Sequence, residues 1–454
     1  MGVYISATCK GFIEFFSEGF HFQITAPFST NILRVSSKTS RVSSKKIQRV
    51  FNFNFNNRTV LMNINRLVIL PDELIDKVIT SFDIKTLTLM KCVCKSWKTL
   101  ISDPDFVKRH FKKQSTHLAF LKNNYEGLRE CKVVPISSLM ESTSNAITLA
   151  IPSRQFYYKD AGRIVGSCNG LVCIQDCSFT SKYNEHVFSF WNFATGTKSE
   201  ALVSFRSNPT RKKNVSVCNF TFGYDNLTDT YKLVLLRLRR DDDLMKTAVT
   251  VFTLGDNDWR DIDCLPVVLV YHPFGNYVRN GVYLKSSISW CVRHRYNCHL
   301  KNLTVEQFVI ISLDLGTETY TKLLLPQCCH EELQHVPTLS VLTDCLYFSY
   351  DFKKTHFVIW QMKEFGVEES WTRFLKFSYT NLLKDFKTHE TYYPPRLIPL
   401  CFSNNGDTLI IAINQPDQVF LYNWKDNRVK RFKSTGRNLW FSAKGYVESL
   451  VSIS

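Results

Sequence analysis

The feature that most limits the fold is a loose repeat of about four strands that recurs five times between residues 162 and 433. Short runs rich in Val, Ile, Phe, Tyr and Trp alternate with polar turns, which is the pattern of β-strands joined by tight connections. The five units cover residues 162–203, 218–262, 280–325, 338–378 and 398–433, and successive units begin every 56–62 residues. Radial repeats of four strands are typical of a β-propeller, with a pair of β-sandwiches as the alternative.

The segments that flank the five units contain material for one more. Residues 115–160 and the tail at 446–451 both hold apolar runs that resemble strands. A blade that combined both ends of the chain would close the ring. The sequence therefore predicts an all-β, propeller-like domain of about six blades over residues 113–454.

Residues 66–112 have a different periodicity, that of short helices. Pro71 suits the first position of a helix, where its missing N–H costs nothing. Asp83 is a good N-cap for a second helix, whose apolar residues continue to Ile101 at spacings of three and four. Asp103, followed by a proline, begins a third short helix. The chain is thus predicted to be an α+β multi-domain protein, with a small all-α unit of about three helices before the β domain.

This helical unit is too small to hide all of its apolar side chains. A unit of fewer than about 50 residues buries too little surface to be comfortable alone. Val78, Leu87 and Trp97 cannot all face one internal core together with the unit's other apolar residues. We expect a docking surface for the helices of a partner, or else packing of this face on the chain's own second domain.

Positive charge is concentrated in the first quarter of the chain. The net charge is +17, and residues 1–115 hold 18 Lys and Arg against 8 Asp and Glu, which is +10 of it. No compact basic array with interleaved aromatic residues accompanies this charge, so we expect a solvated basic surface and no nucleic-acid partner. Residues 1–65 are predicted to be a disordered or poorly structured basic leader, with a transit peptide or a translation start at Met62 as alternatives.

The remaining composition indicates a reducing compartment and no membrane span. The 15 cysteines lie largely in apolar stretches, where reduced thiols behave as small hydrophobic groups. No run of about 18 apolar residues occurs. We expect a protein of the cytoplasm, the nucleus or both, without membrane association.

Motifs for chemistry are weak. The densest Cys/His group holds zinc-type ligands at a spacing that fits no standard finger, and it consists of Cys291, His294, Cys298 and His299. His330 and His335 lie five residues apart, one too many for a zincin pair. No nucleotide-binding loop or nucleophile elbow occurs. We expect no catalytic residue, no metal and no cofactor.

Motifs in both regions resemble one known family. L-P-D-E-L-I from Leu70 and K-C-V-C-K-S-W-K-T-L-I-S-D-P-D-F from Lys91 resemble the F-box of plant F-box proteins. Several later segments resemble the F-box-associated interaction domain of the F-box/kelch-repeat type, namely G-S-C-N-G-L-V-C, F-W-N-F-A-T-G, F-G-Y-D-N-L-T-D-T-Y-K-L-V, V-T-V-F-T-L-G-D-N-D-W-R and L-D-L-G-T-E-T-Y. The resembling segments run from residue 67 to about residue 452.

The resemblance implies that the F-box at 66–112 binds a Skp-type adaptor and, through it, a cullin. The β domain would capture an unknown protein for ubiquitination and degradation, so that the chain is the non-catalytic substrate-recognition subunit of an SCF-type (Skp-cullin-F-box) E3 ubiquitin ligase. The alternatives are an F-box-like scaffold or decayed paralogue outside the ligase, and a propeller metalloenzyme. By resemblance, the adaptor-facing or F-box-core candidates are Leu70, Pro71, Leu74, Ile75, Val78, Ile79, Leu87, Val93, Cys94, Trp97, Leu100 and Ile101.

One position departs from the family. A second Leu-Pro usually precedes the second helix, where this chain has Phe82 and Asp83, and we expect weaker adaptor binding. Loops at one end of a propeller usually meet its ligand. Polarity and length point to segments 239–243, 293–301 and 384–393, and the substrate-binding candidates are Arg239, Arg240, Arg293, Arg295 and Tyr392.

Overall fold

The computed structural model divides into two compact units, Met1–Lys113 and Gln114–Ser454. Before residue 79 the structure describes only five strands. From residue 79 to 452 it describes all residues except 81, 93–94, 112–115, 124–128, 142–156, 159–162, 181, 200–202, 208–217, 242–243, 257, 268–280, 294–302, 327–331, 334, 354, 380–395, 414–417 and 434–436.

The N-terminal strands form two small antiparallel elements. A three-stranded sheet contains β1 (Tyr4–Thr8), β2 (Phe12–Ser17) and β3 (Phe20–Thr25), and a hairpin contains β4 (Phe51–Phe55) and β5 (Arg58–Met62). Only the backbone of these strands is described. Whether residues 1–65 form a disordered or poorly structured leader therefore stays a prediction.

Three described helices follow, α2 (Ile84–Met90), α3 (Lys95–Ser102) and α4 (Pro104–Phe111). The predicted N-caps are confirmed: Asp83 Oδ1 accepts from the Thr86 amide at 2.8 Å, and Asp103 Oδ1 accepts from the Phe106 amide at 2.9 Å. The prediction of one continuous helix from Asp83 to Ile101 is wrong. The Cys92 amide bonds to the Leu89 carbonyl, three residues back, and this tighter turn ends α2.

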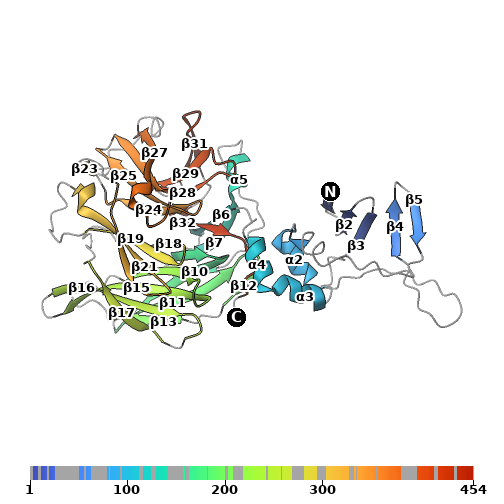
Figure 1. Ribbon diagram of the computed structural model, residues 1–454, viewed down its shortest axis with the longest axis horizontal. Coiled ribbons are helices and arrows are strands. Elements are labelled where there is room, and N and C mark those ends of the chain that lie inside the picture. Colours follow the sequence, from blue (N-terminus) through green and yellow to red (C-terminus); the bar gives the residue numbers. More distant parts are fainter. Residues whose placement is uncertain are drawn as a thin grey trace. The chain divides into compact units, whose positions relative to one another are not determined.

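The second unit is a six-bladed β-propeller (Figure 1). Blade 1 contains β9 (Arg163–Cys168), β10 (Leu171–Phe179), β11 (Asn184–Asn192), β12 (Thr197–Lys198) and β13 (Val203–Ser207). Blade 2 contains β14 (Cys218–Asp225), β15 (Thr230–Asp241), β16 (Leu244–Thr253) and β17 (Arg260–Leu265). Blade 3 contains β18 (Val282–Leu284), β19 (Ser287–Arg293), β21 (Phe308–Asp314) and β22 (Tyr320–Leu323).

Blade 4 carries two extra short strands. Its main strands are β24 (Thr338–Leu342), β25 (Cys345–Phe352), β26 (His356–Met362) and β27 (Trp371–Ser378), with the 3-10 helix η2 (Glu368–Ser370) before β27. β20 (Leu303–Thr304), which precedes the 3-10 helix η1 (Val305–Gln307), pairs with β23 (Glu332–Leu333), and β23 pairs with β25. Blade 5 contains β28 (Leu397–Phe402), β29 (Thr408–Ile413), β30 (Gln418–Asn423) and β31 (Arg428–Lys433).

Blade 6 combines both ends of the second unit, as predicted. Its strands lie in the order β32 (Arg437–Val447), β6 (Thr116–Asn123), β7 (Arg129–Pro135) and β8 (Tyr157–Tyr158), with α5 (Ile136–Glu141) after β7. The innermost strands β32, β9, β14, β18, β24 and β28 contact one another in sequence around the ring. The predicted tail strand at 446–451 was placed too late, because β32 ends at Val447.

Apolar side chains explain why the blades stack. Six clusters of buried apolar residues occur among the described residues, and each lies between two adjacent blades. In β10, for example, Cys173 belongs to the cluster shared with blade 2, and its neighbours Val172 and Ile174 belong to the cluster shared with blade 6. Successive residues of a strand face opposite sides, so a central strand with both faces covered becomes almost continuously apolar.

The antiparallel strand order defines two ends of the ring. At the turn end, short turns join the first strand of a blade to the second and the third to the fourth, as in Asn169–Gly170 between β9 and β10. At the loop end, connections join the second strand to the third and each blade to the next. β6 begins at Thr116 on the turn end, because it pairs there with Val447 at the end of β32.

Candidate interaction surfaces

The described F-box candidates divide into buried and partly exposed residues. Ile79, Leu87 and Ile101 are buried, so they form the core of the helical unit in this chain. Trp97 and Leu100 are half-buried. The other candidates, Leu70, Pro71, Leu74, Ile75, Val78, Val93 and Cys94, lie outside the described residues. Contact with an adaptor stays a prediction for the whole set.

Leu89, on α2, was not among the sequence candidates, although its side chain is 48% exposed. A leucine this exposed on a small helical unit contributes little to the core and can contact a partner. The helical spacing of Ile84, Leu87 and Met90 is the sequence signal for this exposure. These three residues form the buried face of α2, and residue 89 lies outside that face.

Phe82 and Asp83, which stand at the position of the missing Leu-Pro, both have a structural role in this chain. Phe82 is buried, and its carbonyl oxygen accepts a hydrogen bond from His110 Nε2 at 2.7 Å. His110 is itself buried and stacks on Phe106. Asp83 caps α2. The departure therefore keeps an apolar anchor and a defined helix start, while its effect on adaptor binding stays a prediction.

The same side-chain turn recurs at the turn end. The side-chain oxygen of Asn192, Asp225, Asp314 or Asn423 accepts backbone amides two or three residues ahead. In three of these turns a threonine pair follows, such as Thr317 and Thr319, whose hydroxyls lie 2.8 Å apart. These Asx turns explain the recurring sequence pattern D/N-x-x-T-x-T, since the side chain replaces a backbone group in each turn.

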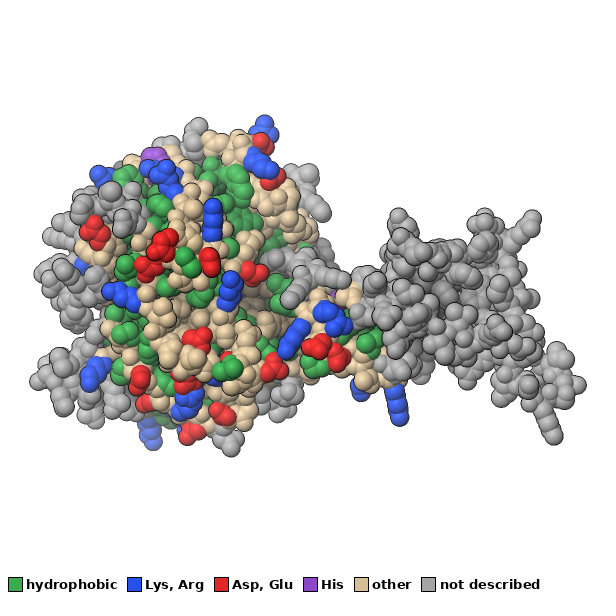
Figure 2. Space-filling view, in the orientation of Figure 1, with side chains coloured by type: hydrophobic (Ala, Val, Ile, Leu, Met, Phe, Trp, Pro, Cys, Tyr) green, Lys and Arg blue, Asp and Glu red, His purple; other side chains and the backbone are tan. Residues whose placement is uncertain are grey.

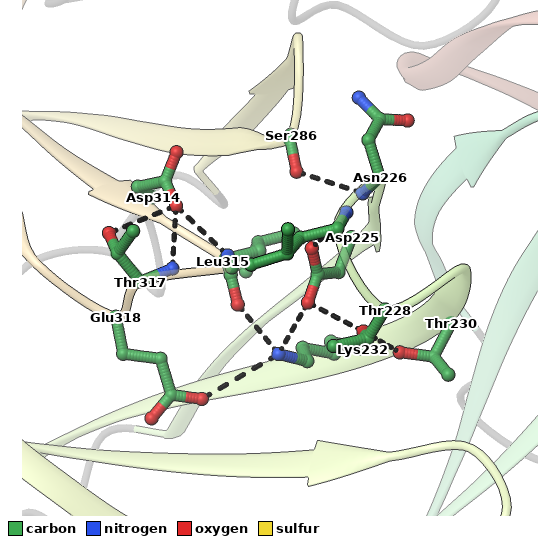
Figure 3. Close-up of polar contacts among 12 residues, drawn as sticks. Asp225, Asn226, Thr228, Thr230, Lys232, Ser286, Asp314, Leu315, Thr317 and Glu318 are labelled. Carbon is green, nitrogen blue, oxygen red and sulfur yellow. Dashed lines mark hydrogen bonds and ion pairs between the residues drawn. The ribbon is translucent and has the colours of Figure 1, made fainter.

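A buried ion pair joins blades 2 and 3 at this end (Figure 3). Lys232 Nζ, on β15, lies 2.9 Å from Asp225 Oδ2 and 3.7 Å from Glu318 Oε1, and it donates to the Leu315 carbonyl at 2.6 Å. The Lys232 side chain is 6% exposed and that of Asp225 is fully buried. Arg260 also pairs with Glu318. One lysine thus connects two strands of its own blade to the turn of the next.

The carboxylates of this network are held ionised. Burial opposes the charge on Asp225, but hydrogen bonds from Thr228, Lys232 and the Leu227 amide outweigh it, so the pKa of Asp225 lies below its usual value. The hydrogen bond from Arg260 is the main cause that lowers the pKa of Glu318. The network is therefore charged at neutral pH and serves to fix the two blades.

The end of the described chain closes the ring at the same end. Asn192 Nδ2, in blade 1, donates to the carbonyls of Ser449 and Val451 at 2.9 and 2.8 Å. The Ala194 amide donates to the Tyr446 hydroxyl. Gly170 lies so close to Ser449 that a Cβ there would stand 2.0 Å from the Ser449 Cβ. The segment after β32 is therefore packed on blade 1.

At the loop end of blade 1, three polar side chains are joined by hydrogen bonds within apolar surroundings. Arg163 Nε donates to Gln175 Oε1 at 2.8 Å, and Gln175 Nε2 donates to His186 Nδ1 at 2.7 Å. His186 also packs near Phe205 and Phe220. Burial, with the nearby Arg163 charge, lowers the pKa of His186 to about 4. The imidazole is thus neutral at physiological pH.

The substrate-binding candidates within the described residues belong to one end of the ring. Arg239 and Arg240 lie in β15 near the β15–β16 connection, and Arg293 is the last residue of β19. Segment 384–393 lies in the connection between β27 and β28, which is also at the loop end. Arg295 and Tyr392 lie outside the described residues, and the side chains of Arg239 and Arg240 are not described. Binding by these residues stays a prediction.

Other classes of site find no support in the described part of the chain. It contains no group of three or more His, Cys, Asp or Glu that could hold a metal ion, although three of the four residues in the Cys291 group lie outside it. Among the same residues no helix is long and apolar enough to cross a membrane. Figure 2 shows acidic and basic side chains interspersed over the face of the propeller in view.

The sequence holds signals for two buried charged residues, Lys232 and Arg293, whose contacts were not predicted. Lys232 interrupts the otherwise apolar stretch T-Y-K-L-V-L-L, and a charge in a central strand indicates a buried partner. Arg293 is the last residue of the strand S-I-S-W-C-V-R, and it shares a face of that strand with Cys291. Among the sequence predictions Arg293 is only a substrate-binding candidate, and its burial depends on the stacking of blades.

Comparison with known proteins identifies the class to which this architecture belongs. Residues 127–453 match the F-box associated beta propeller domain, and residues 67–109 match the F-box domain. The chain therefore belongs to the family of F-box proteins that carry an F-box-associated β-propeller. This architecture supports a substrate-recognition role, with an F-box of the type that binds Skp-type adaptors, and it is generally non-catalytic.

Individual relatives agree with this family. An F-box/kelch-repeat protein of Arabidopsis thaliana is 26% identical over 387 residues, covering 84% of this chain and 95% of its own length. The F-box protein CPR1 of Arabidopsis thaliana is 23% identical over 399 residues, covering 84% of this chain and 88% of its own length. Among solved structures, the β-propeller domain of the Trilobed protease from Pyrococcus furiosus is similar at 10% identity and a TM-score of 0.35, over 71% of this chain and 81% of that one. That likeness is too remote to bear on function.

Proposed function

We propose that this chain is the substrate-recognition subunit of an SCF-type E3 ubiquitin ligase. The F-box docks a Skp-type adaptor, which connects the chain to a cullin, and the propeller captures the protein to be ubiquitinated and degraded. The observation that carries the proposal is the union of an F-box with an F-box-associated propeller in one chain.

The mechanism is proximity and needs no chemistry in this chain. A bound target is kept near an enzyme carried elsewhere in the complex, so its lysines are modified at a high effective concentration. The cysteines lie largely in apolar stretches of the sequence, which supports a working place in the reducing cytoplasm or nucleus.

Adaptor binding is the first test. The full chain is co-purified with a Skp-type adaptor, and the dissociation constant is measured for wild type, Leu89→Ala and Trp97→Ala. Loss of an anchoring apolar side chain at such an interface weakens binding by about tenfold or more. Leu89 is exposed, so its truncation leaves the fold intact. Lys85→Ala, at an exposed position on the same helix, is the matched control.

The full ligase is the second test. The double variant Leu70→Ala and Pro71→Ala is expected to lose cullin co-precipitation while still capturing targets through the propeller. A target captured by both proteins, but ubiquitinated in a reconstituted reaction only with wild type, supports the proposal. Wild type that binds no adaptor would contradict it and would favour a scaffold outside the ligase.

A further inference from the structure

Arg293 stands at the loop end of blade 3 with an unusual degree of burial. It is the last residue of β19, where the chain leaves the sheet. Its side chain shares a face of the blade with Phe308, directly opposite on β21, and with Cys291 two residues earlier. Phe308 and Cys291 belong to the apolar cluster between blades 3 and 4. The side-chain stem and the Nε atom of Arg293 thus border an apolar core.

This guanidinium has no counterion in the described part of the chain. Arg293 is 9% exposed, and its buried Nε atom has no hydrogen-bond partner. No ion pair among the described residues includes it. By contrast, Lys232, the buried cation at the turn end, has a carboxylate at 2.9 Å.

The connections on either side of β18 and β19 in the chain contain no acid, whereas the connection between blades 3 and 4 contains Glu331 and Glu332. No ion pair among the described residues joins either of these glutamates to the guanidinium. Segments 268–280 and 294–302, which join β17 to β18 and β19 to β20, contain no Asp or Glu. The same is true of segment 208–217, which joins blade 1 to blade 2. Together these three loop-end segments contain six basic residues, Arg211, Lys212, Lys213, Arg279, Arg295 and Lys301.

A charge removed from water without a partner is strongly destabilising, and a matched oxyanion removes that penalty. The planar guanidinium forms paired hydrogen bonds with a carboxylate or a phosphate, and such bonds are stronger at a site of low polarity.

We propose that Arg293 is an oxyanion-recognition residue, which binds an acidic or phosphorylated side chain of the captured protein at the loop end of blade 3. The inference rests on the proposed function, because it specifies the chemistry of the target that the propeller captures. It gives the loop end a cationic subsite built on a strand end, where the rigid sheet holds the guanidinium in place.

The test measures anion binding by the purified full chain. Three fluorescein-labelled peptides of one sequence carry either glutamate, phosphoserine or glutamine at a single central position, and fluorescence polarisation reports their affinities. Wild type is expected to bind at least one anionic peptide about tenfold more tightly than the glutamine peptide. The ranking of the glutamate and phosphoserine peptides distinguishes an acidic from a phosphorylated target.

Two variants separate recognition from a structural role. Arg293→Met is expected to abolish the preference for the anionic peptide and to raise the Tm of the free protein, because it removes an uncompensated charge. Inorganic phosphate, at constant ionic strength, is expected to raise the Tm of wild type and not that of Arg293→Met. Lys322→Met removes an exposed charge from β22 of the same blade and is expected to leave both results unchanged.

Arg293→Lys covers the case in which the methionine variant does not fold. It keeps the charge but loses the paired geometry, so the preference for the anionic peptide is expected to fall and not vanish. The proposal is overturned if wild type prefers neither anionic peptide, or if the Arg293 variants retain the wild-type preference. Adaptor co-purification is independent of these assays, so this failure would leave the proposed function standing.

Discussion

Two buried cations at opposite ends of the propeller, Lys232 and Arg293, have opposite surroundings. At the turn end Lys232 is surrounded by Asp225, Glu318 and the Leu315 carbonyl. At the loop end Arg293 is buried beside an apolar cluster, and its Nε has no partner. Lys232 has all three of these partners within the chain, which is typical of a structural group.

The contrast between Lys232 and Arg293 indicates that the turn end stabilises the fold, and that recognition is expected at the loop end. Repeated Asx turns, the Lys232 network and the contacts of Ser449 all lie at the turn end. The last two join segments of the chain that are far apart in the sequence. The loop end contains the longer connections between strands, where functional residues usually lie on a rigid scaffold. Substitutions at the turn end and at the loop end can test this contrast.

The largest effect is expected from breaking the buried ion pair. Lys232→Met leaves the buried Asp225 carboxylate without its cation, and removing one partner of such a pair costs about 3–5 kcal/mol of unfolding free energy. Urea unfolding monitored by tryptophan fluorescence measures the loss. Adding Asp225→Asn to this variant removes the uncompensated charge and is expected to recover part of it. A change of less than about 1 kcal/mol for Lys232→Met would show that the turn end does not depend on this pair.

A second effect is expected where the chain end packs on blade 1. Gly170→Ala and Gly406→Ala both place a Cβ at positive φ, +81° and +74°, which costs about 1 kcal/mol in each case. Only the first also places it against Ser449, since nothing lies within 4 Å of the Cβ position at residue 406. We expect Gly170→Ala to be less stable than Gly406→Ala by about 2 kcal/mol in the same unfolding assay. Equal losses would mean that the segment after β32 moves away easily.

The smallest effect is a pH dependence at the loop end. His186 has a pKa of about 4 in the folded chain against an ordinary value of 6.5, so the unfolded chain binds this proton first as the pH falls. The stability due to neutral His186 is fully present above pH 6.5 and is lost between pH 6.5 and pH 4. The full shift corresponds to about 3 kcal/mol, and screening by solvent reduces the expected loss to about 2 kcal/mol.

His186→Gln, which does not titrate, is the matched variant for this measurement. Its unfolding free energy is expected to fall less steeply than that of wild type over the same pH interval. Other titrating groups are common to both proteins, so the difference between the two curves isolates His186. Parallel curves would contradict the expectation and would indicate that the protonated imidazole finds a partner.

Much of the fold was predictable because its signals are local. The alternating apolar runs predicted about six blades, and strand residues such as Val172 and Cys173 need only their period of two to show that both faces are covered. Asp83 and Asp103 predicted the starts of two helices, because their side chains act as N-caps. The end of α2 escaped prediction, because the spacing of apolar residues continues past it in the sequence. In the structure the Cys92 amide instead bonds to the Leu89 carbonyl, three residues back.

The candidate sites were predictable only in part. Polarity selected the loop-end segments and Arg293, and a family resemblance selected the F-box residues. Sequence period could not show that Ile79, Leu87 and Ile101 are buried within the unit while Leu89 is exposed, because several apolar stripes compete for one small core. Which of these residues face an adaptor stays a prediction.

The sequence by itself determined the local conformations of this protein, since strand alternation, turn chemistry and helix caps act over a few residues. Only the tertiary structure decided which charges are paired. Lys232 and Glu318 are 86 positions apart in the chain, and they meet because blades 2 and 3 stack. Arg293 lies beside an apolar cluster for the same reason. Contact between distant residues depends on how whole blades pack, and a buried charge acquires its role from that packing.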